Sequence, residues 1–222
     1  MKILTAGDSF TYGEELADLH KAWPHVLGKK INAEVVNLGR PACSNDKIFR
    51  LTFEHLIDFN SSKTDLVVIG WTSPGRMEFA DDIGYYDVWP GYGGNLFTKD
   101  GCVWRQELVN YISQYHNSKY LHKKFLQQVI MMQNFLTSRN IKYVMLNTLQ
   151  NEYYKQQPIN DPDRSDYFKE IDNTRFMEFN NSGMVEWADR CPKGPNGHFL
   201  EKGHQVVADR IYEHIRNLGW LS

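Results

Sequence analysis

Two polar residues near the start of the chain and one near its end are of the types that carry out acyl transfer. Asp8 and Ser9 follow the apolar run 3–6 after a single glycine, and His198 lies in a polar segment close to the other end. A serine that attacks a carbonyl carbon needs a base to accept its proton, and histidine is the usual base because it titrates near neutral pH. The simpler interpretation is that Asp8 or Ser9 caps a following helix.

The elements that must position these residues alternate between strand and helix. Short apolar runs predict the strands, and apolar residues at helical spacing predict the helices between them. Such an alternation predicts a parallel sheet of about five strands, covered on both faces by helices. The predicted strands are 2–6, 33–39, 65–71, 141–149 and 183–189, and the predicted helices are 22–31, 44–59, 118–138 and 203–219.

The ends of the first three predicted strands each contain a glycine, and this favours a nucleophilic role for Ser9 over a role as a simple helix cap. In such sheets, ligands bind outside the carboxyl ends of the strands. A helix cap after the first strand would not require glycines at the ends of the other two. The segment before the last helix, with His198, lies at the same edge if the strand that precedes it is parallel. The three strand ends are Gly7-Asp8-Ser9, Asn37-Leu38-Gly39 and Gly70-Trp71-Thr72.

These blocks, in this order, resemble those of the SGNH (GDSL-type) hydrolases. The resemblance spans nearly the whole chain and implies a three-layer α/β/α, flavodoxin-like fold and the hydrolysis of acyl or acetyl esters without a metal or organic cofactor. It implies that Ser9 is the nucleophile, that its backbone N–H and that of Gly39 stabilise the oxyanion, and that His198 is the general base. His204, six residues further on, is expected to pack within the fold.

The chain departs from this family pattern at two positions. Thr72 stands where the third block has an asparagine, so either its hydroxyl or the Asn45 amide is expected to be the further oxyanion donor. Pro195 stands where the last block has the acid that orients the histidine. Asp189 is the expected substitute because it would end the fifth strand; the alternative is a Ser–His pair oriented by a backbone carbonyl.

Two loop-rich insertions, at 73–117 and 150–183, interrupt what we expect to be a single domain over residues 1–222. The first is rich in aromatic residues and acids, which suit the apolar faces and hydroxyls of sugar rings. We therefore expect an acylated carbohydrate as substrate. The same aromatics could instead fold the loop onto the domain, form a lid or form an oligomer contact. The aromatic residues expected to bind substrate are Trp71, Tyr86 and Trp89.

Composition and motif content argue against nucleic-acid binding, a membrane span, a metal site and nucleotide binding. A formal net charge of −2 with interspersed charges gives no basic surface for nucleic acid. There is no apolar stretch long enough to span a membrane and no secretory signal, so we expect a cytoplasmic protein, without excluding release by lysis. The three cysteines are far apart, and His198 and His204 lack the partners of a metal site. No nucleotide-binding motif is present.

The sequence thus predicts a serine hydrolase that cleaves carboxylic esters through an acyl-serine intermediate. The alternative is a binding module for a glycan or a protein on the same scaffold, with weak catalysis or none. The missing asparagine and the displaced acid are what this alternative would predict.

Overall fold

The computed structural model of the chain describes residues 1–58, 63–80, 82, 84–88, 114, 117–149 and 162–221. The strands are β1 (Lys2–Ala6), β2 (Glu34–Asn37), β3 (Leu66–Trp71), β4 (Met77–Ala80), β5 (Tyr85–Val88), β6 (Lys142–Asn147) and β7 (Phe176–Met177). The helices are α1 (Ser9–Tyr12), η1 (Leu19–Lys21), α2 (Trp23–Lys30), α3 (Asn45–Ile57), α5 (Ser118–Ser138), α7 (Pro162–Glu170), α8 (Met184–Trp187) and α9 (Glu201–Asn217).

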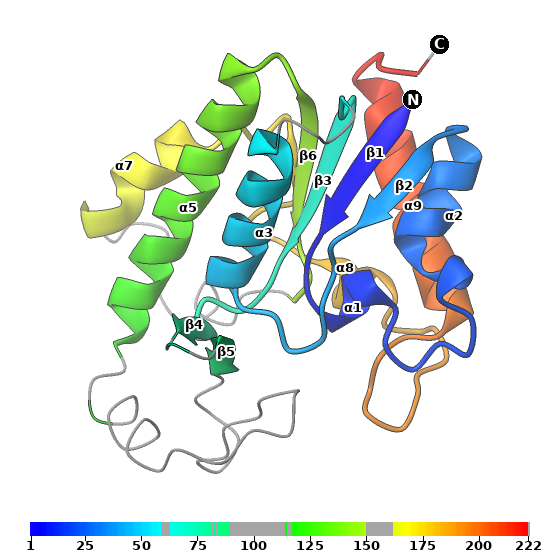
Figure 1. Cartoon of the computed structure of the whole chain (residues 1–222), viewed down its shortest axis with the longest axis horizontal. Helices are drawn as coiled ribbons and strands as arrows, with labels where there is room; N and C mark the ends of the chain where they lie inside the picture. Colours follow the sequence, from blue (N-terminus) through cyan, green and yellow to red (C-terminus); the bar gives the residue numbers. More distant parts are fainter. Residues whose placement is uncertain are drawn as a thin grey trace.

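The centre of the molecule is a five-stranded parallel sheet in the order β2-β1-β3-β6-β7. Helices α3 and α5 cover one face, and α2 and α9 cover the other (Figure 1). The predicted three-layer α/β/α fold is therefore confirmed. Parallel pairing places the carboxyl ends of β1, β2, β3 and β6 at one edge of the sheet. Every segment that carries chemistry in the sections below begins at this edge or faces it.

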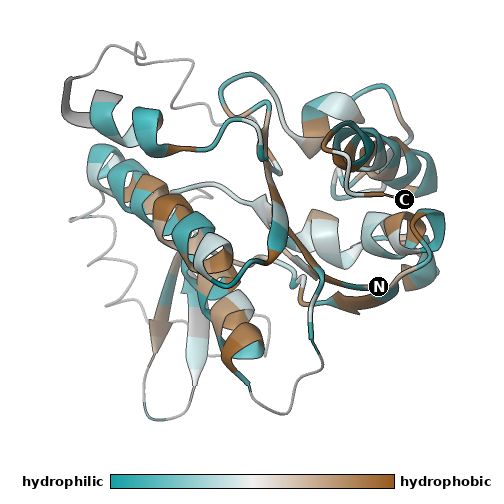
Figure 2. Ribbon diagram, turned by 90° about the horizontal axis from the view of Figure 1, so that it is seen from above, coloured by the Kyte–Doolittle hydropathy of each residue, from teal (hydrophilic) through white to brown (hydrophobic). Residues whose placement is uncertain are grey.

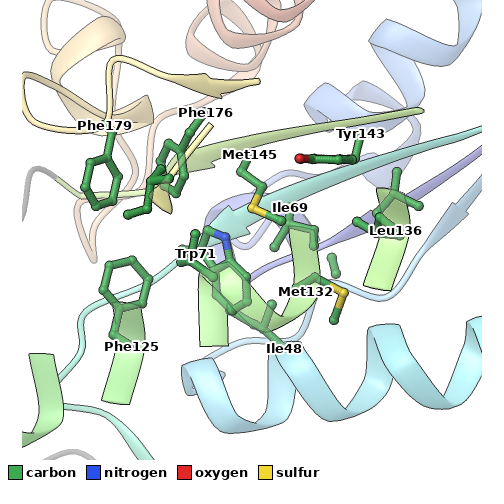
Figure 3. Packing of buried hydrophobic residues seen from close by; sticks show 14 of the residues in the cluster. Ile48, Ile69, Trp71, Phe125, Met132, Leu136, Tyr143, Met145, Phe176 and Phe179 are labelled. Atoms are coloured by element: carbon green, nitrogen blue, oxygen red, sulfur yellow. The ribbon is translucent and has the colours of Figure 1, made fainter. Parts of the chain in front are cut away.

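Alternation along the strands divides the core into two clusters. In β3, Val67, Ile69 and Trp71 pack toward α3 and α5, whereas Leu66 and Val68 pack toward α2 and α9. Successive side chains of a strand point to opposite faces, so both faces of a central strand must be apolar. Figure 3 shows the first cluster, and Figure 2 shows the hydrophobic positions that recur along the long helix α5. Among the described residues, no helix is long and apolar enough to cross a membrane.

The fifth strand is not where the sequence predicts it. The apolar residues of 183–189 form the short helix α8, and its N-cap residue, Gly183, donates its N–H to the Glu186 carboxylate at 2.7 Å. The strand that pairs with β6 is β7, which has only two residues. An apolar run this short fits either element, and a glycine followed three residues later by glutamate favours the helix start.

The first insertion begins with an antiparallel hairpin, β4–β5, which is clamped to α3. Asp87 accepts hydrogen bonds from the backbone and side chain of Ser44, at 3.0 and 2.8 Å, and from Lys47 at 2.7 Å. Arg50 forms a two-point ion pair with Glu78, at 2.9 and 2.7 Å. The start of this insertion is thus fixed to helix α3 by hydrogen bonds and ion pairs. Residues 89–113, which hold most of its aromatics, lie outside the described residues.

Candidate active site

A buried carboxylate joins the carboxyl ends of three strands. Asp8 is fully buried; its Oδ2 accepts a hydrogen bond from the Thr72 hydroxyl at 2.7 Å, and its Oδ1 accepts one from the Thr148 hydroxyl at 3.3 Å. Oδ1 also accepts from the backbone N–H of Phe10 at 3.1 Å, which caps α1. Arg76 Nη1 lies 3.5 Å from Oδ2. Asp8 therefore caps α1, as the simpler interpretation of this segment has it, and its bonds fix the position of the residue that follows it.

That residue, Ser9, faces His198 across the edge of the sheet. The Ser9 Oγ lies 2.9 Å from His198 Nε2, although the two residues are 189 positions apart. Figure 1 shows α1 at the end of β1, beside the loop that leads into α9. The Phe10 ring packs against the imidazole with ring centroids 4.7 Å apart and so supports one of its faces. The sequence-based prediction that this serine and this histidine meet is borne out by the geometry.

The other ring nitrogen of His198 is bound by a carboxylate that the sequence analysis missed. Glu15 Oε2 lies 2.9 Å from His198 Nδ1 and also accepts the backbone N–H of His198 at 3.0 Å. Glu15 Oε1 accepts the backbone N–H of Asn196 at 2.8 Å. An ionised carboxylate only accepts hydrogen bonds, so Nδ1 must carry the proton. Nε2 is then free to accept the proton of Ser9, which is the tautomer a general base requires.

Backbone geometry brings Glu15 to this position. Gly13 and Glu14 both donate their N–H groups to the Ser9 carbonyl at 3.0 Å, which ends α1 in a tight turn. Gly13 has φ 93° and Glu15 has φ 69°, both in the left-handed region. A non-glycine residue pays about 1 kcal/mol or more for this conformation, so other contacts must hold it. Here the three hydrogen bonds to its carboxylate do so.

The same contacts set the ionisation of Glu15. Burial on its own would raise the pKa of this carboxyl, whose side chain is only 9% exposed. The backbone N–H groups of Asn196 and His198, and the His198 side chain, outweigh burial, so that the pKa of Glu15 lies below its ordinary value. Glu15 is therefore a carboxylate at neutral pH, as an orienting acid must be.

Asp189 does not fill the role expected of it. Its side chain is 73% exposed and pairs with Lys193 at 3.1 Å. It follows helix α8 rather than a strand, so it is not delivered to the sheet edge, and the Nδ1 that it was expected to hold is bound by Glu15. The alternative of a backbone carbonyl as the orienting group is likewise replaced by the Glu15 carboxylate.

The residues expected to stabilise an oxyanion are engaged within the framework. Gly39 donates its N–H to Asn37 Oδ1 at 2.9 Å, and the Thr72 hydroxyl donates to Asp8. The Asn45 amide donates to the Thr72 carbonyl at 3.0 Å and accepts its N–H at 2.9 Å, so it fixes the end of β3 instead. Within the described part of the chain, the backbone N–H of Ser9 has no acceptor.

Of the aromatic residues expected to bind substrate, Trp71 is contradicted by the structure. It is fully buried in the core, and its ring centroid lies 5.9 Å from that of Phe125. Figure 3 labels both rings within the hydrophobic cluster. The residue ends a central strand that is buried on both faces, so its side chain enters the core rather than the cleft. The Tyr86 side chain and Trp89 lie outside the described residues.

His204 is a buried structural residue, as expected. Its Nδ1 accepts the backbone N–H of Trp23 at 3.1 Å, and its ring packs edge-on against Phe199. Burial, followed by the nearby His198, lowers the pKa of His204 to about 3, so the ring stays neutral. Among the residues that the structure describes, no group of three or more histidine, cysteine or acidic side chains is arranged to hold a metal ion.

Comparison with known families places nearly all of this chain in one group. Residues 11–222 match the family described as "Family of unknown function (DUF6071)". The chain belongs to this family. The matched range of DUF6071 includes Glu15 and His198 and begins two residues after Ser9. A search of curated proteins found no match.

The fold of this DUF6071 chain is similar to that of lipolytic proteins of the G-D-S-L family and of esterases, which confirms the fold that the resemblance implied. A lipolytic protein of the G-D-S-L family from Veillonella parvula has a TM-score of 0.51 and 16% identity, covering 96% of this chain and 97% of that one. The psychrotrophic esterase EstA from Pseudoalteromonas sp. has a TM-score of 0.57 and 13% identity, covering 98% and 97%. The acetyl xylan esterase Est2A from Butyrivibrio proteoclasticus has a TM-score of 0.50 and 16% identity, covering 100% and 64%.

Proposed function

We propose that the protein is a serine hydrolase that cleaves carboxylic esters, with Ser9 as nucleophile, His198 as general base and Glu15 as the acid that orients it. The observation that carries this proposal is the unbroken chain of hydrogen bonds from Ser9 Oγ through both ring nitrogens of His198 to Glu15, with both steps at 2.9 Å. A nucleophile bound to a base that is itself oriented by a third group is the arrangement that activates a serine.

The chemistry follows from the proton positions. As Ser9 Oγ attacks the ester carbonyl carbon, its proton passes to His198 Nε2, and Glu15 stabilises the imidazolium that forms. The tetrahedral intermediate collapses, the bond to the alcohol breaks, and Nε2 returns the proton to the departing oxygen. Water then enters, Nε2 takes one of its protons, and the resulting hydroxide attacks the acyl carbon. The bond from that carbon to Ser9 Oγ breaks, Nε2 returns the proton to Oγ, and the acyl group leaves as a carboxylic acid.

Two backbone N–H groups, those of Ser9 and Gly39, are the candidate donors to the oxyanion. The backbone N–H of Ser9 is the donor that no described residue engages, and Gly39 would have to release Asn37 to contribute a second. Each missing donor typically costs about 2.7–4 kcal/mol of transition-state stabilisation, or about 10²–10³ in rate. We therefore expect a slow hydrolase on simple esters, with substrate binding needed to complete the oxyanion site.

An acylated carbohydrate remains the proposed substrate class. It is supported by the aromatic and acidic composition of the first insertion. Structures of similar fold include the acetyl xylan esterase and a two-domain esterase active on acetylated mannans, the latter with a TM-score of 0.52 and 12% identity. The likeness to these proteins is one of fold, so the sugar part of the substrate rests on the composition of this chain.

Hydrolysis of 4-nitrophenyl acetate by the wild type and by Ser9→Ala and His198→Ala tests the proposal. Removing either member of such a unit abolishes nearly all the enzymatic rate. We expect both variants to fall to the background rate while their circular dichroism spectra stay those of the wild type. Equal rates for all three proteins would refute the proposed activity.

The rival function is a binding module on the same scaffold. The engagement of Gly39, Thr72 and Asn45 within the framework is the specific observation in its favour. A binder would retain an acetylated oligosaccharide without turnover, and Ser9→Ala would bind it as tightly as the wild type. Release of acetate from that ligand by the wild type alone would exclude the rival.

A further inference from the structure

A second carboxylate lies on the reacting side of His198. Glu14 Oε2 is 3.7 Å from His198 Nε2, the nitrogen that also faces Ser9 Oγ. Glu15, by contrast, binds Nδ1 on the far side of the ring. The Glu14 side chain is 37% exposed, so it borders the open side of the site rather than its interior. The proton-relay chemistry proposed above does not use this residue.

Backbone contacts fix Glu14 relative to the nucleophile. Its N–H donates to the Ser9 carbonyl at 3.0 Å, next to the same bond from Gly13, so that the nucleophile and Glu14 belong to one tight turn. The left-handed conformation of Glu15 follows at once in the chain. The Glu14 carboxylate can rotate but cannot move far from Ser9.

No described lysine or arginine forms an ion pair with Glu14. The described charged groups beside the imidazole are the carboxylates of Glu14 and Glu15, and the buried ring of His204 nearby is neutral. Arg40 is the cation in the next loop, and its Nη1 donates to the Gly39 carbonyl at 2.8 Å. Among the described side chains that contact His198, the charged ones are therefore carboxylates.

We propose that Glu14 is a specificity-determining residue, which makes the site select esters that are uncharged around the scissile bond and reject anionic ones. This inference rests on the proposed hydrolase function. A substrate carboxylate within about 8 Å of Glu14 would be repelled through a partly solvated medium, which corresponds to about a 3- to 10-fold loss in kcat/KM. The natural substrate is accordingly a neutral ester, such as an acetylated sugar hydroxyl, rather than an ester of an acidic sugar or of a dicarboxylic acid.

A matched pair of acetate esters tests this inference. 4-Acetoxybenzamide and 4-acetoxybenzoate have the same acyl group and nearly the same shape, and they differ in one negative charge. The ratio of their kcat/KM values is measured for the wild type, for Glu14→Gln, and for Glu34→Gln, which removes an exposed carboxylate at the opposite edge of the sheet. Dividing the ratios of two proteins cancels the intrinsic reactivity of the two esters.

We expect Glu14→Gln to raise the relative rate on the benzoate about 3- to 10-fold and Glu34→Gln to leave the ratio unchanged. In 1 M NaCl, where charges are screened beyond about 3 Å, the wild-type ratio should approach that of Glu14→Gln. The role of Glu14 would be overturned if the ratio of kcat/KM on the benzoate to that on the benzamide were the same in Glu14→Gln as in the wild type. A ratio that is higher in the wild type than in Glu14→Gln would overturn it as well. If Ser9→Ala hydrolyses both esters as fast as the wild type, the proposed hydrolase function itself fails, which is a separate outcome.

Discussion

His204 should make the stability of the fold depend on pH. In the folded protein its Nδ1 accepts the Trp23 N–H, and no proton can be added there without breaking that bond. Its pKa is lowered from 6.5 to about 3, first by burial and then by His198. The unfolded chain therefore binds a proton at this ring below about pH 6.5, whereas the folded protein does not. Protons bound only by the unfolded state favour unfolding, so stability must fall as the pH falls.

The magnitude follows from the two pKa values. At pH 5 the unfolded ring is about 97% protonated and the folded ring is almost entirely neutral, which lowers the free energy of unfolding by about 2 kcal/mol relative to pH 8. The loss begins near pH 7, grows by about 1.4 kcal/mol per pH unit, and levels off near pH 3. Other histidines with lowered pKa values, such as His25, add to the total slope.

Urea unfolding at pH 8, 6.5 and 5 measures this effect, with His204→Gln as the comparison. Glutamine keeps an acceptor for the Trp23 N–H but does not titrate. We expect the variant to be less stable at pH 8, because it loses the contact with Phe199, and to lose about 2 kcal/mol less than the wild type between pH 8 and pH 5. If both proteins lost the same free energy over this range, the buried neutral state of His204 would be refuted.

Three further predictions concern the site. Glu15→Gln should lower kcat on 4-nitrophenyl acetate by about 10²–10⁴, because a neutral amide can also donate to Nδ1, so it does not fix the tautomer, and it has no charge to stabilise the imidazolium. Asp189→Asn should leave kcat unchanged, and the opposite ranking would restore Asp189 as the acid. Gly194→Ala places a Cβ 2.6 Å from Glu15 Cδ. The displaced carboxylate should reduce kcat about 10-fold or more, while the urea midpoint stays unchanged. Full activity would show that the carboxylate can move aside without losing its contact with His198. Asp8→Asn should cost about 3 kcal/mol of stability, measured by urea unfolding, because Arg76 and two hydroxyls lose their buried charge; a change below about 0.5 kcal/mol would contradict this.

The part of the site that is carried by strand ends was predictable from the sequence. The apolar runs of β1, β3 and β6 have the length and composition of buried parallel strands, and the polar residues directly after them had to meet at one edge. This ground placed Ser9 at the edge, whereas the pairing with His198 came from the resemblance, because the segment 183–189 before His198 is a helix and not the expected strand. The same reasoning failed for residues 183–189, since an apolar run of that length fits a helix as well as a strand.

Glu15 could not be found in this way because its place depends on two left-handed residues in a turn. The signal in the sequence was the Gly-Glu-Glu run at 13–15, four residues after the serine. A glycine there indicates a turn, but nothing in the composition shows that the chain would reverse so tightly that a carboxylate reaches the histidine loop. Trp71 was misjudged for a related reason: the end of a central strand is still core on both faces.

Covalent labelling tests the central claim most directly. A fluorophosphonate probe reacts with a serine only when a base has activated its hydroxyl, and mass spectrometry of the digested protein locates the modified residue. We expect one phosphonate on Ser9 in the wild type and none in His198→Ala. Labelling at another residue, or no labelling of the folded wild type by an active probe, would contradict it.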